Sequence, residues 1–129
     1  CGNVLHVHDL ADFVSEEAAM AGKNAVKYIK GETNNSTAGR IDLVPEDGVR
    51  YTVPKYIRPE NMADTLTVRF RVGGVVKNCY ISTYFDDERV MKRKRPVVAP
   101  GEMEEVKISK AKLAEYPDLK KITIKIEKE

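Results

Sequence analysis

The sequence predicts a mainly β protein, in which a two-sheet β-sandwich follows one isolated α-helix. Two observations support this prediction. Apolar residues recur every three or four positions between residues 9 and 30, whereas they alternate with polar residues beyond residue 49. The first spacing is that of a helix with one apolar stripe, and the second is that of strands with one buried face.

Composition and charge are those of an ordinary globular chain. Of the 129 residues, 42% are hydrophobic and 33% are charged, which predicts a packed core and excludes a disordered chain. A net charge of +2 does not by itself indicate nucleic acid or an anionic membrane. Cys1 and Cys79 form no CxxC pattern, so they fit free thiols in a reducing, cytoplasmic location. No apolar run approaches the roughly 20 residues of a membrane span.

The predicted helix begins near Asp9 and stops at Gly31. Asp9, Asp12 and Ser15 are its candidate N-caps. Gly22 costs about 1 kcal/mol relative to alanine inside a helix, so it indicates close packing against a sheet or a ligand. The apolar stripe consists of Leu10, Val14, Ala18, Ala21, Ala25 and Ile29. Because most of these side chains are small, the stripe suits close approach to a flat partner.

Short strands are expected after the helix. Residues 65–72 give the clearest alternation, and Val49, Tyr51 and Val53 are expected on one face of an earlier strand. Residues 86–88 form a hairpin turn. Six or seven such strands predict an immunoglobulin- or fibronectin III-like β-sandwich, preceded by one isolated α-helix.

The composition divides the chain into three parts. Residues 1–31 end a larger domain, and residues 49–129 form the sandwich. Residues 32–48 are expected to be a linker, because they begin with a polar stretch that lacks large apolar side chains.

His6, His8 and Asp9 are the candidate metal ligands. A His-x-His pair in extended backbone directs both rings to one side, whereas Asp9 points away. Only two ligands result and the chain has no third histidine, so no metal site is expected. The histidines are expected to hydrogen-bond locally, or to lie beside a cofactor.

Residues 89–95 form a dense basic run, and Cys79 lies in a predicted strand. A charged edge strand that blocks sheet aggregation explains the run better than nucleic-acid binding does. Docking on an acidic partner subunit is a further interpretation. Cys79 is expected to be a buried thiol, and no autonomous catalytic motif is present.

Gly2-Asn3, followed by a helix with Gly22 and Ala25-Val26, resembles the last motif of FAD-dependent pyridine nucleotide oxidoreductases of the thioredoxin reductase and glutathione reductase type. The string from Cys1 to Leu10 is similar to that of a bacterial NAD(P)/FAD-dependent subgroup. Proteins of this subgroup are often found beside glycerol 3-phosphate dehydrogenase proteins and carry an added C-terminal domain.

The resemblance implies cofactor-binding roles for five residues. Gly2 would allow close backbone approach to FAD, and Asn3 stands where the family has an aspartate. The helix start at Leu10, Ala11 and Asp12 would direct N–H groups and a positive dipole end toward the flavin. No catalytic residue is assigned.

The resemblance therefore implies a C-terminal fragment of an FAD-dependent oxidoreductase. Its flavin chemistry would lie upstream, and FAD is expected in the parent protein but not on the fragment alone. The sandwich would dock a partner subunit, such as a glycerol 3-phosphate dehydrogenase-like protein, or a second protomer. No nucleic acid is expected as a partner. The alternative is a free-standing adhesion or carbohydrate-binding β-sandwich.

Overall fold

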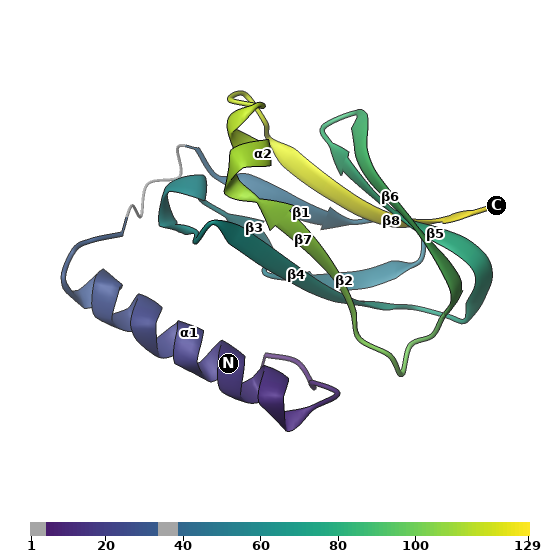
Figure 1. Ribbon diagram of the computed structural model, residues 1–129, viewed down its shortest axis with the longest axis horizontal. Helices are drawn as coiled ribbons and strands as arrows, with labels where there is room; N and C mark the ends of the chain where they lie inside the picture. Colours follow the sequence, from purple (N-terminus) through teal and green to yellow (C-terminus); the bar gives the residue numbers. More distant parts are fainter. Residues whose placement is uncertain (1–4, 34–38) are drawn as a thin grey trace. The chain divides into compact units, whose positions relative to one another are not determined.

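The computed structural model describes residues 5–33 and 39–129 (Figure 1). The chain divides into two compact units, residues 1–35 and residues 36–129. The first unit holds the predicted helix, and the second holds the predicted strands. Each unit has its own fold and is described by itself.

The helix α1 spans Ala11–Ile29. Its N-cap is Leu10, whose side chain cannot cap a backbone N–H, so the three polar candidates do not occupy the N-cap position. Gly31 follows the helix with a φ of +70°, a conformation that favours glycine, and the predicted stop is confirmed. Glu17 is the one buried residue of α1. A Cβ added at Gly22 meets no atom within 4 Å, so Gly22 makes no close contact with the described residues of its own unit.

The second unit contains two β-sheets. One has the strand order β3-β1-β8-β5-β6, and the other has the order β2-β4-β7. Neighbouring strands are antiparallel except for β1 and β8, which are parallel. The strands span Ile41–Pro45 (β1), Val49–Val53 (β2), Tyr56–Ile57 (β3), Thr65–Val72 (β4), Val76–Phe85 (β5), Glu88–Val98 (β6), Glu104–Ser109 (β7) and Lys121–Lys128 (β8). The mainly β class and the sandwich preceded by a helix are thereby confirmed.

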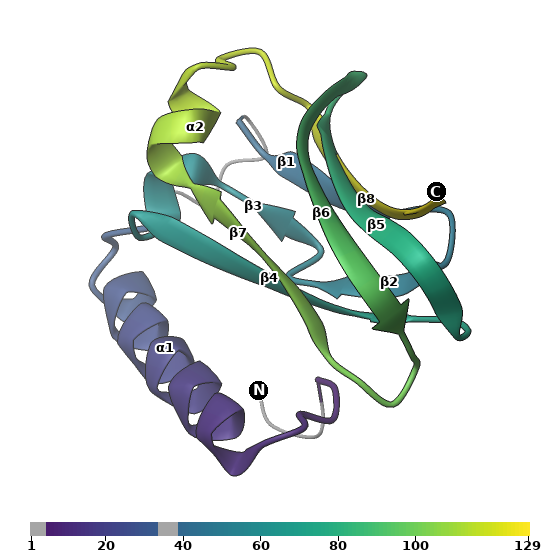
Figure 2. The same cartoon turned by 45° about the vertical axis from the view of Figure 1, so that its right-hand side comes forward.

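Short helical segments complete the second unit. The helix α2 spans Lys110–Ala114 and directly follows β7 (Figure 2). Its N-cap is Ser109, whose side chain accepts a hydrogen bond from the backbone N–H of Lys112 at 3.1 Å. A 3₁₀ turn spans Pro59–Asn61.

Strand β1 corrects the expected linker, residues 32–48. Ile41–Pro45 pairs with β8 over four residues, and Ile41 and Leu43 are buried in the core. The sandwich therefore begins before residue 49. Gly, Asn, Ser and Thr concentrate in the first part of the expected linker, and the alternation of Ile41 and Leu43 with Asp42 continues the strand pattern upstream.

Strand β2 corrects a second expectation, because its burial does not follow simple alternation. Val49 and Thr52 are buried, whereas Tyr51 and Val53 are only half-buried. The register against β4 shifts between Val49 and Tyr51, as at a β-bulge. An extra residue in one strand turns the following side chains to the opposite face, which places Thr52 inside. Its hydroxyl donates to the carbonyl of Leu43 at 3.4 Å.

The core lies between the two sheets and draws residues from both. Of the inward residues expected on β4, Val68, Phe70 and Val72 are at most 1% exposed, and Leu66 is partly buried against the core. Ile122 and Ile124 of β8 are fully buried as well. The hairpin turn is confirmed at Asp86-Asp87, since Phe85 pairs with Glu88. On β4, which has no bulge, the alternation of the sequence therefore predicts the buried face correctly.

Glu127, on β8, couples stability to pH. Ser82 and Tyr84 donate hydrogen bonds to its carboxylate at 2.7 and 2.6 Å, and Arg89 and Lys125 lie nearby. These contacts, led by the bond from Ser82, hold the pKa of Glu127 at about 2, below its ordinary value of 4.5. A lowered pKa in the folded state stabilises the fold above pH 4.5, and this contribution is lost as the pH falls from 4.5 toward 2.

We therefore expect Glu127→Gln to lower the free energy of unfolding at pH 7 by about 1–2 kcal/mol. The difference from the original protein should narrow as the pH falls from 4.5 to 2. Urea unfolding followed by circular dichroism across this pH range measures both quantities. The control is Glu102→Gln, because the side chain of Glu102 is 61% exposed. A stability difference that does not change with pH would contradict the assigned cause.

Candidate functional site

The N-terminal unit brings two histidines and one glutamate together. In the loop before α1, His6 and His8 are buried, whereas Val7 between them and Asp9 after them are exposed. This alternation confirms that the two rings point to one side. Glu17, in the second turn of α1, is the buried residue that meets them. The second turn of α1 therefore contacts the loop that precedes the helix.

The His6, His8 and Glu17 side chains form a compact cluster. Nε2 of His8 lies 3.0 Å from Oε2 of Glu17 and is hydrogen-bonded to it, and Nε2 of His6 lies 3.5 Å from Oε1. The two imidazole rings meet edge to face with centroids 4.3 Å apart. One ligand atom from each residue can be chosen so that all lie within 4.8 Å of one another. The expected local hydrogen bonding is therefore present at His8, with a carboxylate as the partner.

Sequence reasoning missed Glu17. Asp9 was weighed as the third ligand because it adjoins the histidines, but Asp9 is exposed. Glu17 is not among the candidate ligands that the sequence suggests. The sequence does hold one signal. Glu17 follows His8 by nine residues, and at that spacing a side chain in the second turn of a helix can contact the loop before the helix. That signal requires the angle between loop and helix, which the sequence does not specify.

The five residues assigned to the cofactor by resemblance differ in their outcome. Gly2 and Asn3 lie outside the described residues. Leu10, Ala11 and Asp12 are exposed at the start of α1, where Leu10 is the N-cap. Their exposure leaves the positive end of the helix dipole accessible. The contact of these residues with a flavin stays a prediction.

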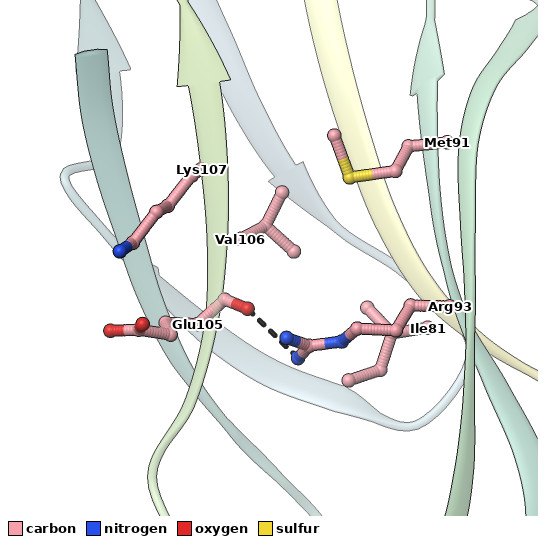
Figure 3. A pocket seen from close by; sticks show the side chains of 6 residues that line it. All are labelled: Ile81, Met91, Arg93, Glu105, Val106 and Lys107. Carbon is pink, nitrogen blue, oxygen red and sulfur yellow. Dashed lines mark hydrogen bonds between the residues drawn. The ribbon is translucent and has the colours of Figure 1, made fainter.

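The sandwich carries a groove along β6 and β7, each of which lies at an edge of its sheet. One part has a volume of about 370 Å³ and is lined by Ile81, Met91, Arg93, Glu105, Val106 and Lys107 (Figure 3). Nη2 of Arg93 crosses from β6 to β7 and donates to the carbonyl of Glu105 at 2.9 Å. An adjoining part of about 450 Å³ shares Met91 and Lys107 and continues toward α2. The walls are apolar and the rim is charged.

The basic run of residues 89–95 lies on the edge strand β6, as predicted. Several of its cations have acidic partners within the chain. Arg89 pairs with Glu127, Arg93 and Arg95 pair with Glu104, and Lys94 pairs with Glu129. Nζ of Lys92 lies 4.0 Å from the centre of the Tyr80 ring. These intramolecular contacts satisfy much of the charge that a polyanion would otherwise attract.

Cys79 is a fully buried thiol in β5, as expected. Burial is the main cause that raises its pKa, and the charge of Glu104 adds to this effect. The sulfur faces the carbonyl oxygens of Val76 and Arg95. A buried thiol with a raised pKa is a poor nucleophile, so Cys79 serves packing.

Comparison with known proteins gave no match: no family model matches the chain, and no curated protein or solved structure does either. Among the described residues, no helix is both long enough and apolar enough to cross a membrane.

Proposed function

We propose that this chain is the C-terminal part of an FAD-dependent NAD(P) oxidoreductase, with the sandwich as an accessory docking module. The exposed stripe of α1 carries this proposal. Leu10 is 57% exposed and Ile29 is 83% exposed, and the alanines between them are exposed as well. A 19-residue helix rarely keeps an apolar stripe in water, because such helices gain most of their stability from packing that face.

The occupant of the stripe is the flavin domain of the same protein. Ala18, Ala21 and Ala25 have small side chains, so the helix can approach a flat surface such as a β-sheet closely. Gly22 adds open space beside them, with no atom near its Cβ position. Because Gly2-Asn3 and this helix resemble the flavoprotein motif, we propose that this sheet belongs to the flavin domain.

The start of α1 supplies the proposed electrostatic role. Backbone N–H groups at Ala11 and Asp12 form the positive end of the helix, and both residues are exposed. Negative charge that develops on a reduced flavin is stabilised by such a helix end. Catalytic groups and the NAD(P) site belong to the preceding domains in this proposal.

The test uses the complete reading frame that encodes this chain. We expect it to contain a GxGxxG motif upstream, and the purified protein to be yellow from bound FAD and to oxidise NADH or NADPH. A complete protein without flavin absorbance and without FAD-supported NAD(P)H oxidation would overturn the proposal. The same protein without residues 39–129 should keep both its flavin and this activity, because the sandwich is accessory.

The docking surface of the sandwich is the groove along β6 and β7, and its proposed occupant is an extended acidic segment of a partner subunit. Edge strands offer unpaired backbone groups to an added strand. A second copy fits poorly, since antiparallel pairing of β6 with itself would bring its basic run of residues 89–95 against the same run of the other copy. Lys107 lines both parts of the groove and favours acidic side chains.

A synthetic peptide of alternating glutamate and valine probes this surface. Added to the chain, it should shift amide resonances of β6 and β7, and Lys107→Glu should abolish the shifts. Lys55→Glu is the matched control, since Lys55 is an exposed lysine between β2 and β3. The absence of shifts, equal binding of a lysine and valine peptide, or self-association of the chain through β6 would each contradict an acidic partner segment.

A further inference from the structure

We propose that His6, His8 and Glu17 bind a divalent transition metal ion of the zinc type. The proposal goes beyond the flavin assignment and does not rest on it. Two imidazole nitrogens and one carboxylate oxygen form a ligand set that zinc accepts in proteins. Three protein ligands leave a fourth position for water or for a ligand from another molecule.

The spacing of the ligand atoms suits one ion. Zinc binds nitrogen and oxygen at about 2.0–2.2 Å, so ligand atoms around it lie roughly 3–4 Å apart. The contacts of Glu17 with His8 and His6 measure 3.0 and 3.5 Å. One ligand atom from each of the three residues can be chosen so that all lie within 4.8 Å of one another, close to the spacing around one ion. The ion would lie beside the carboxylate, between the two rings.

Burial favours an ion at this position. The side chains of His6, His8 and Glu17 are 3%, 0% and 10% exposed. Nδ1 of His8 is buried and has no hydrogen-bond partner among the described residues, so this ring retains an unused nitrogen. A metal bond at Nε2 of His8 would leave this Nδ1 as an N–H donor, the position at which metal-bound histidines usually take a second-shell partner.

The ion would fix the loop to the helix. His6 and His8 precede α1, and Glu17 lies in its second turn, so one ion joins both segments. Along the chain, the helix start at Leu10, Ala11 and Asp12 lies between the ligands His8 and Glu17. A metal at this place therefore holds the backbone on both sides of the helix N-terminus, as structural zinc does in other small units.

Zinc titration of the untagged, chelator-treated chain tests the proposal, in a Cys1→Ser background that removes a competing thiol. Calorimetry should show one Zn²⁺ per chain. His8→Asn and Glu17→Gln should each weaken binding by at least about 100-fold, since even residues outside a ligand set change affinity by about 10–100-fold. Glu16→Gln is the control, because Glu16 is the adjacent and exposed carboxylate of the same helix. The Zn²⁺ affinity of Glu16→Gln should equal that of the chain without this substitution.

Cobalt provides a second readout that does not depend on folding energy. Co²⁺ bound to the Cys1→Ser chain should show the intense visible bands of a four-coordinate site, and adding Glu17→Gln should abolish these bands while the helical circular dichroism persists. The proposal is overturned if Zn²⁺ does not bind with a stoichiometry of one. Equal affinities of Glu17→Gln and Glu16→Gln would also overturn it. Neither result bears on the flavin proposal, which is tested on the complete protein.

Discussion

Phe70→Ala is expected to lower the free energy of unfolding of the sandwich by about 3–5 kcal/mol. Phe70 is a 0% exposed residue of β4, and Val68 and Val72 flank it on the same inward face. Strands β2 and β7 pair with β4 on either side, so the surrounding backbone is held by two ladders. Because these ladders limit collapse of the structure around the lost ring, the substitution leaves a cavity as well as removing apolar burial.

Urea unfolding followed by circular dichroism measures this change. Thr67→Ala is the matched control, because Thr67 lies on the same strand with its side chain on the half-exposed face. Its cost should stay below about 1 kcal/mol, the range of strand propensity. A loss of less than 1 kcal/mol at Phe70, with an unchanged dependence on denaturant, would show that the two sheets do not close over this ring.

Arg95→Met is expected to have the second largest effect, about 2–3 kcal/mol. Glu104 is a buried carboxylate on β7, with only 4% of its side chain exposed. Arg95 donates to its Oε1 from Nε at 3.2 Å and from Nη2 at 2.8 Å, and Arg93 contacts Oε2 at 3.3 Å. Removal of Arg95 leaves the buried carboxylate of Glu104 with fewer partners. The desolvation of this charge is then no longer compensated, which accounts for most of the cost.

The exposed neighbour on β6 provides the comparison. Lys94→Met breaks an ion pair with Glu129 in which both side chains are 57% exposed, so its cost should be much smaller than that of Arg95→Met. Adding Glu104→Leu to Arg95→Met should recover part of the lost stability, because it removes the buried charge itself. A double variant whose cost is the sum of the two single costs would contradict a direct coupling between Arg95 and Glu104.

These two predictions depend on features that differ in how far sequence reveals them. The inward face of β4 was predictable, since residues 65–72 alternate without interruption and the structure buries Val68, Phe70 and Val72. The pairing of Glu104 with Arg95 was not predictable. It joins consecutive strands that lie in different sheets. The alternation that buries Val106 and Ile108 also places Glu104 on their inward face, but it does not specify which cation pairs with it.

The two corrected expectations have local causes. Strand β1 was assigned to the linker because it is only five residues long and follows a polar segment, and its pairing with β8 involves residues about eighty positions away. Tyr51 and Val53 of β2 were expected on the face of the buried Val49, but a register shift between Val49 and Tyr51 interrupts the alternation. Both errors arise where long-range pairing overrides the local pattern.

The sequence by itself determined the helix, the change from helical to strand periodicity, the edge position of the basic run and the buried state of Cys79. Each of these follows from local spacing or from residue chemistry, which act within a few positions along the chain. Only the tertiary structure decided that Glu17 meets His6 and His8, and that Glu104 is buried beneath Arg95. Such contacts depend on how elements turn toward one another, and packing of the whole fold sets those angles.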